Sequence, residues 1–312
     1  MLDSVDELGN LIAHINVHVP DNAPHPTVVF LQNVWVVLDQ FVTLYGSKST
    51  TAEPMARCFR KLIESTQLHF APILPLLLTK IVQGFEQSKL SCYLWIAAKC
   101  VRVFGGVEQY QQDIRVLIES LTSIVFLMVQ NPGSSEEPEI GNLFLYSVKC
   151  NVFLVIEEYH YLLSQFIDSN PFLFLQAKLA PATLQCALHC LSTAQDESSI
   201  SSILKYLLDL FEMTKAERTS LLEYSLPIVI PLMREQGPTL MSHLFRGLVY
   251  NFSKDRGLIC DVADVIYVMS RQLGVEPVFT MIGETVSSFP KNELSVELQG
   301  VFLTKIKRYA LF

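Results

Sequence analysis

Apolar residues recur three and four positions apart along almost the whole chain. Val34, Leu38 and Phe41 fall on one helical face in this way, and Ile203 and Leu207 do so on another. No segment shows the strict alternation of apolar and polar residues that is typical of strands. The pattern predicts helices at 3–16, 27–45, 52–67, 70–86, 90–104, 107–131, 139–167, 178–193, 198–213, 216–235, 238–251, 258–273, 276–288 and 293–310.

Paired helices would give a repeat of about 40 residues, which is the length of HEAT-type units. We therefore expect an all-α fold, a right-handed α-solenoid of HEAT-type helical hairpins with an ARM-like superhelix. Residues 1–26 are expected to form a short helix and linker, interpreted as a truncated repeat, and residues 27–312 the repeat array. An unpaired first repeat should leave an apolar face exposed.

Helix ends are predicted where glycine, proline and short polar residues cluster. Gly105-Gly106, the loop at 131–135, Gly237-Pro238 and Gly274 are the clearest breaks. The apolar stretch within 140–164 is interpreted as a candidate insertion. Because its apolar residues are not confined to one stripe, we expect poor packing or low order at 143–156.

Composition and charge narrow the class of protein. Half of the residues are hydrophobic and the mean hydropathy is +0.33, which suits helices buried on two sides. The stretches 70–82 and 143–163 are interrupted by proline or charged residues, so no membrane span is expected. The acidic N-terminus carries no export signal, which favours an intracellular protein. The net charge of −8 argues against direct nucleic-acid binding.

The seven cysteines are scattered through predicted helices and are expected to be reduced and buried. Cys186, His189 and Cys190 are spaced to share one helical face, so they are candidate zinc ligands, but a fourth ligand is missing. Core packing is the favoured interpretation. No metal or cofactor is expected.

The run from Glu157 to His160 is a candidate for acid–base chemistry. Adjacent helical residues point about 100° apart and do not converge on one substrate atom, so a solvated helix edge is favoured. Phosphate-binding and nucleophile motifs are missing from the sequence. An enzyme is therefore not expected.

Two basic clusters remain. Arg57, Arg60 and Lys61 form a cationic stripe on one predicted helix. Lys305, Lys307 and Arg308 end the last helix, where positive charge suits the helix dipole. A solvated surface is the simpler interpretation of both clusters.

Several segments resemble, in order and spacing, the C-terminal half of one receptor group. They are Leu31–Asp39, Arg57–Leu62, Phe70–Pro75, Asp168–Leu175, Gln185–Ala187, Pro277–Phe279 and Ser288–Pro290. The chain is similar to the transportin-SR and importin-thirteen group of the importin-β (karyopherin-β) nuclear transport receptors. The resemblance covers nearly the whole chain.

The resemblance implies a nuclear import receptor fragment that binds protein cargo, such as Arg-Ser-rich splicing factors, on its concave face. Arg57 and Arg60 match an arginine-rich helix that grips phosphorylated Arg-Ser domains, and Lys61 adds a charge beside them. Guanidinium groups suit two-point phosphate contacts. Ile63 and Gln67, however, stand where that stripe would continue with arginine.

The same resemblance implies nucleoporins as partners and a location in the nucleus and cytoplasm. Binding of the Ran GTPase is not expected, since the family binds it mainly through N-terminal repeats that this chain lacks. The alternative is an unrelated helical-repeat scaffold or adaptor for protein–protein interaction. Arg57 and Arg60 would have no need to be accessible in such a scaffold.

Overall fold

The structure is a computed structural model that describes residues 7, 19–20, 23–130, 141–194, 196–215, 219–252, 256–290, 297, 299–301 and 304; side chains at 141–151, 215 and 256 lie outside that description. All regular elements within these residues are helical. They belong to two compact units, Met1–Ala177 and Lys178–Phe312.

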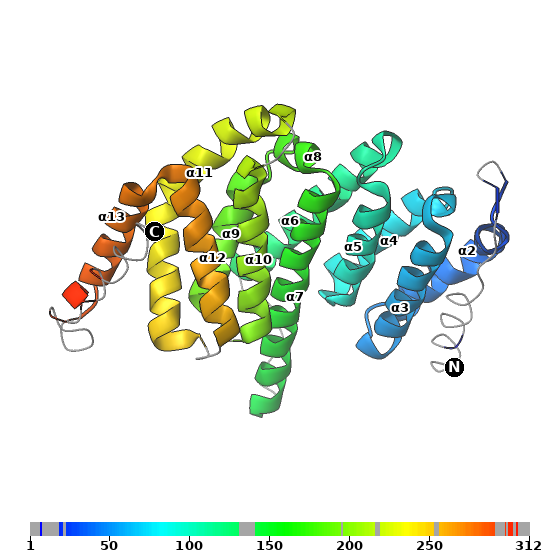
Figure 1. Cartoon of the computed structure of the whole chain (residues 1–312). Helices are drawn as coiled ribbons and strands as arrows, with labels where there is room; N and C mark the ends of the chain where they lie inside the picture. Colours follow the sequence, from blue (N-terminus) through cyan, green and yellow to red (C-terminus); the bar gives the residue numbers. More distant parts are fainter. Residues whose placement is uncertain are drawn as a thin grey trace. The chain divides into compact units, whose positions relative to one another are not determined.

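The first unit stacks its helices in two layers (Figure 1). One layer holds α2 (Pro26–Tyr45), α4 (Leu74–Ser88) and α6 (Gln111–Gln130). The other holds α3 (Ser49–Thr66), α5 (Cys92–Phe104) and α7 (Gly141–Ser169). Short helical turns at Gln67–Phe70 and Glu108–Tyr110 connect the layers, and α8 (Pro171–Gln176) packs against α6 and α7.

The second unit repeats this two-layer arrangement. Helices α9 (Ala180–Thr193), α11 (Thr219–Arg246) and α13 (Val275–Ser287) pack in one row, while α10 (Glu197–Glu212) packs against α12 (Arg256–Leu273). A turn at Met213–Lys215 follows α10, and a π-helical turn at Gly247–Asn251 follows α11. The predicted all-α solenoid of helical hairpins is confirmed, whereas the predicted domain bounds stay a prediction.

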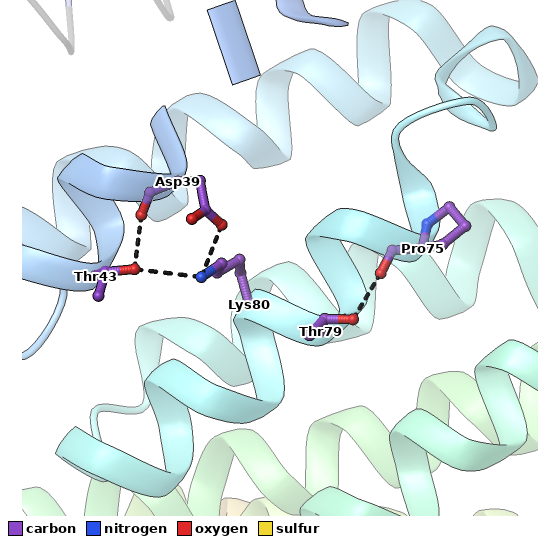
Figure 2. Close-up of polar contacts among 5 residues, drawn as sticks. All are labelled: Asp39, Thr43, Pro75, Thr79 and Lys80. Atoms are coloured by element: carbon purple, nitrogen blue, oxygen red, sulfur yellow. Dashed lines mark hydrogen bonds and ion pairs between the residues drawn. The ribbon is translucent and has the colours of Figure 1, made fainter. Parts of the chain in front are cut away.

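Single polar contacts fix the register between neighbouring helices. On α4, Lys80 Nζ lies 2.7 Å from the Asp39 carboxylate and 3.3 Å from the Thr43 hydroxyl, both on α2 (Figure 2). In the second unit, the hydroxyls of Thr183 on α9 and Tyr206 on α10 are buried and 2.6 Å apart. Because the Thr183–Tyr206 bond is buried, it favours one alignment of α9 and α10 over others that apolar burial alone would allow.

Helix α2 is the one described helix that is long and apolar enough to cross a membrane, with a mean hydropathy of 1.4. Length and composition alone do not establish a span, because core helices of soluble proteins pass the same test. The helix buries Val28, Leu31 and Trp35. It also exposes apolar side chains such as Phe30 and Val36.

The predicted break at Gly237-Pro238 is wrong, because α11 runs unbroken through it and also contains Pro227 and Pro231. An interior proline costs about 3 kcal/mol of helix stability. This cost is offset by burial of a continuous apolar stripe, which includes Val229 and Met233. Gly237 lies in that stripe, and a Cβ there would lie 2.8 Å from Met281 Sδ.

Other expectations are met or corrected locally. The predicted stop at Gly105 is confirmed as the C-cap of α5. Residues 143–156 lie within α7, and Val155 and Ile156 are buried, so the expected poor packing is wrong at these two positions. The predicted helix at 3–16, the loop at 131–135 and most of 293–310 lie outside the described residues.

Gly84→Ala is expected to destabilise the first unit by about 2 kcal/mol, because it overpacks a filled contact. A Cβ at Gly84 on α4 would lie 2.3 Å from Cζ of Tyr93 on α5. The Tyr93 ring cannot move away freely, since its hydroxyl donates a 2.8 Å hydrogen bond to the carbonyl oxygen of Gly46. Thermal unfolding followed by circular dichroism at 222 nm measures the change.

Gly283→Ala on α13 is the matched control. Apart from the backbone of its own helix, nothing in the described part of the chain lies within 4 Å of a Cβ at that position. Alanine is favoured over glycine in a helix by about 0.5–1 kcal/mol. This variant should therefore unfold at a slightly higher temperature than the native chain. Stabilisation by both substitutions would contradict the role assigned to Tyr93.

Candidate functional site

The cation cluster of α3, defined as Arg57, Arg60 and Lys61, lies on the layer formed by α3, α5 and α7. All three side chains are half-buried. The opposite face of α3 supplies core residues, including Cys58, Phe59 and Leu62. The apolar stripe of the helix therefore turns the cationic stripe away from the core.

Arg60 is positioned by an aromatic side chain from the neighbouring helix. Its guanidinium carbon lies 5.9 Å from the centre of the Trp95 ring on α5, which is within cation–π range. A guanidinium stacked on an indole keeps its N–H groups available at its edge. Stacking thus limits the rotamers of Arg60 while leaving its hydrogen-bonding capacity in place.

A carboxylate from α7 approaches the same pair. Burial raises the pKa of Glu158, and Glu157 beside it acts in the same direction, whereas the Trp95 indole and the Arg60 guanidinium lower it. Trp95 Nε1 is buried, and it forms no complete hydrogen bond with any acceptor among the described residues. Glu158 therefore lies near this nitrogen without a fully formed bond.

The rest of the layer also carries both signs of charge. Lys99 on α5 forms a 3.1 Å ion pair with Glu64 on α3. Near the start of α5, burial raises the pKa of the Cys92 thiol to about 12; Glu53 raises it as well and Arg57 lowers it. The mixed-charge layer, as we name this surface, comprises the cations Arg57, Arg60, Lys61 and Lys99 and the carboxylates Glu53, Glu64, Glu157 and Glu158.

The end of the cationic stripe has a structural reason. Ile63 is fully buried, so a charged residue there would face the core. Gln67 follows the last residue of α3 and has a φ of 48°, so it is no longer on the helical face. The α3 stripe is therefore limited to one turn by where the helix packs and where it ends.

The run from Glu157 to His160 does not form an acid–base site. Tyr159 and His160 are buried in the core, whereas Glu157 and Glu158 are half-buried at the surface. His160 Nδ1 is 2.8 Å from the carbonyl oxygen of Ile156, and the Tyr159 hydroxyl donates to Thr122 on α6. The prediction of a solvated edge is thus wrong for the aromatic half of this run.

The proposed zinc ligands do not converge. Cys186 and Cys190 are buried, whereas His189 is exposed. The two sulfurs share a hydrogen bond, which raises the pKa of Cys190 and lowers that of Cys186. Within the described part of the chain, no group of three or more His, Cys, Asp or Glu side chains is placed to hold a metal ion.

Two further expectations have different outcomes. Cys260 is exposed on α12, so the prediction that all cysteines are buried is wrong there. Lys305, Lys307 and Arg308 lie outside the described residues, as does the side chain of Cys150. The pairing of Arg60 with Trp95 and Glu158 was not predicted, since these residues are far apart in sequence and no local spacing links them.

Comparison with known proteins places this surface in a family context. Residues 25–129, which include α3 and α5, match a family model described as the fourth TPR domain of Transportin-3/Importin-13. Transportin MOS14 of Arabidopsis thaliana is 20% identical over 292 residues, covering 93% of this chain and 28% of the relative. Importin-13 of Homo sapiens is 24% identical over 166 residues, covering 53% of this chain and 16% of that relative.

An uncharacterized protein of Schizosaccharomyces pombe is 22% identical over 279 residues, covering 87% of this chain and 27% of that relative. A solved structure titled Importin13 cytosolic state has the same fold, with a TM-score of 0.76 and 15% identity. The alignment covers 98% of this chain and 32% of the chain in the solved structure. The chain therefore spans about a third or less of each of these proteins.

The stacked hairpins define the class of protein as an α-helical-repeat scaffold. The family model, the relatives and the structural neighbour all show similarity to the transportin and importin group of nuclear transport receptors, with the family model matching residues 25–129.

The stability of the first unit is expected to fall as the pH is lowered from about 7 toward 4. Burial lowers the pKa of His160 from 6.5 to about 4. Between these values the unfolded chain binds a proton that the folded chain excludes, so acid favours unfolding. His160→Phe should flatten this pH dependence. Melting temperature is measured against pH from about 4.5 to 7.5 for the native chain and the variant. The difference between the two slopes gives the contribution of His160 alone.

Equal slopes for the native chain and the variant would contradict a neutral, buried His160. Tyr161→Phe is a suitable control, because Tyr161 is the exposed neighbour on the same helix and phenols do not titrate in this range. Its slope should equal that of the native chain.

Proposed function

We propose that the chain forms part of the cargo-binding scaffold of a nuclear import receptor, and that the mixed-charge layer of α3, α5 and α7 contacts the cargo. The observation that carries the proposal is the family match over residues 25–129, the segment that contains both α3 and α5. Such a scaffold makes and breaks no bond, and it would act in the nucleus and the cytoplasm.

The charge pattern of this layer favours a cargo that itself carries both signs. A phosphorylated Arg-Ser segment alternates guanidinium and phosphate groups along an extended backbone. Arg60 would offer its N–H edge to a phosphate, while exposed carboxylates such as Glu64 suit the arginines of the cargo. A purely basic ligand would instead be repelled by the cations of α3.

Preorganisation supports Arg60 as the principal contact. An exposed arginine loses about 2 kcal/mol of rotamer entropy when it is fixed. The stack on Trp95 has already limited that freedom in the free protein, so less is lost on binding. Arg57 and Lys61 flank it with further positive charge.

Arg57→Gln/Arg60→Gln is expected to weaken binding of a phosphorylated Arg-Ser peptide by at least about tenfold, since each charge-assisted hydrogen bond is worth about 1.5–3 kcal/mol. Fluorescence anisotropy with matched phosphorylated and unphosphorylated peptides measures this. The unphosphorylated peptide should bind more weakly to the native chain.

Arg115→Gln is the matched control. Arg115 lies on α6 in the other layer, where it forms a 2.7 Å ion pair with Glu119, and its loss also removes one positive charge. Binding should be unchanged in this variant. Retention of full affinity by the double variant, or the same loss in the control, would exclude the α3 cations as the cargo contact.

A further inference from the structure

A second polar site lies wholly within the second unit. A pocket of about 340 Å³ opens between the end of α9 and the end of α11. Ser192 lines it from α9, and Ser242, His243, Arg246, Tyr250 and Asn251 line it from α11 and the π-helical turn. Polar side chains thus line it from two helices, and the Ser192 hydroxyl donates a 2.7 Å hydrogen bond to the carbonyl oxygen of His189.

The turn from Gly247 to Asn251 shapes this pocket. It widens the last turn of the helix into a π-helix, a local distortion that is often found at functional sites. Gly247 is required there, because the Phe252 ring lies 2.2 Å from where a Cβ would be. Phe252 packs against Gly247, and its backbone N–H donates a 2.7 Å hydrogen bond to the Gly247 carbonyl oxygen. Tyr250 and Asn251, in the turn between them, line the pocket.

The charge around the pocket is positive. His243 and Arg246 are three residues apart and therefore share one face of α11. Burial lowers the pKa of His243, and the nearby Arg246 and His189 lower it further, so the positive charge of the pocket comes from Arg246. Both of these neighbours are basic, although the chain as a whole has a net charge of −8.

Arg246 is the arginine that lines this pocket. It is exposed, and among the described residues it forms no ion pair. Basic residues near a helix C-terminus are favoured by the helix dipole. That effect does not explain the three hydroxyls and the amide that line the same pocket.

We propose that this pocket binds a phosphomonoester. A phosphate offers oxygen acceptors for the Arg246 guanidinium, the Ser242 hydroxyl and the Asn251 amide. The volume lies within the range of small-ligand sites and exceeds what a bare phosphate needs, so it leaves room for the atoms that carry it. The proposal does not rest on the cargo-binding layer, since all lining residues belong to the second unit.

The test is isothermal titration calorimetry of the full chain with three ligands: inorganic phosphate, O-phosphoserine and a phosphoserine peptide of neutral sequence. Arg246→Gln should weaken binding on the order of tenfold, because it removes a charge-assisted contact. Arg234→Gln is the matched control, as Arg234 is an exposed arginine of the same helix outside the pocket lining. It should bind like the native chain.

The ligands distinguish the source of the phosphate. Binding of the peptide that is sensitive to Arg246→Gln supports a protein-borne phosphate, and binding of inorganic phosphate alone with the same sensitivity supports a free ion. No binding of any ligand, or equal weakening by Arg234→Gln, would overturn the proposal.

Discussion

The first unit depends on the burial of α5 between its neighbours. Almost every side chain of this helix is buried, from Cys92 to Phe104, and it packs against both α3 and α7. A helix covered on two sides by its own layer and on a third by α4 keeps only a narrow strip for polar groups. Trp95 and Lys99 occupy that strip. The chemistry available to the layer is therefore set by what the packing of α5 leaves uncovered.

This constraint explains why the polar groups of three helices meet. Trp95 and Lys99 are one turn apart, so α3 and α7 must bring their charged side chains to the same strip. Arg60 and Glu64 do so from α3 and Glu158 from α7. The half-buried setting strengthens each interaction relative to one in water, but it also penalises any charge that lacks a counterpart. A layer with both signs satisfies that condition.

Much of the fold could be predicted from periodicity, and the exceptions share a cause. Gly105 ends a helix as expected, whereas Gly237-Pro238 does not, because the apolar stripe of α11 continues on both sides. Local propensity is thus overridden where tertiary burial is continuous. The candidate cations of α3 were identifiable from spacing alone. Their partners were not, since Trp95 and Glu158 meet Arg60 only through stacking of separate repeats.

The two basic regions differ in how their charge is balanced, and this difference bears on what each can recognise. On α3, Arg60 lies among carboxylates and an indole, so a ligand must compete with existing partners and gains affinity mainly through matched geometry. Beside the π-helical turn, His243 has basic neighbours and Arg246 pairs with no described carboxylate. Arg246 therefore carries a positive charge with no described counterpart, which an anion would supply on binding. The balanced surface favours discrimination among ligands, whereas the unbalanced pocket favours capture of negative charge.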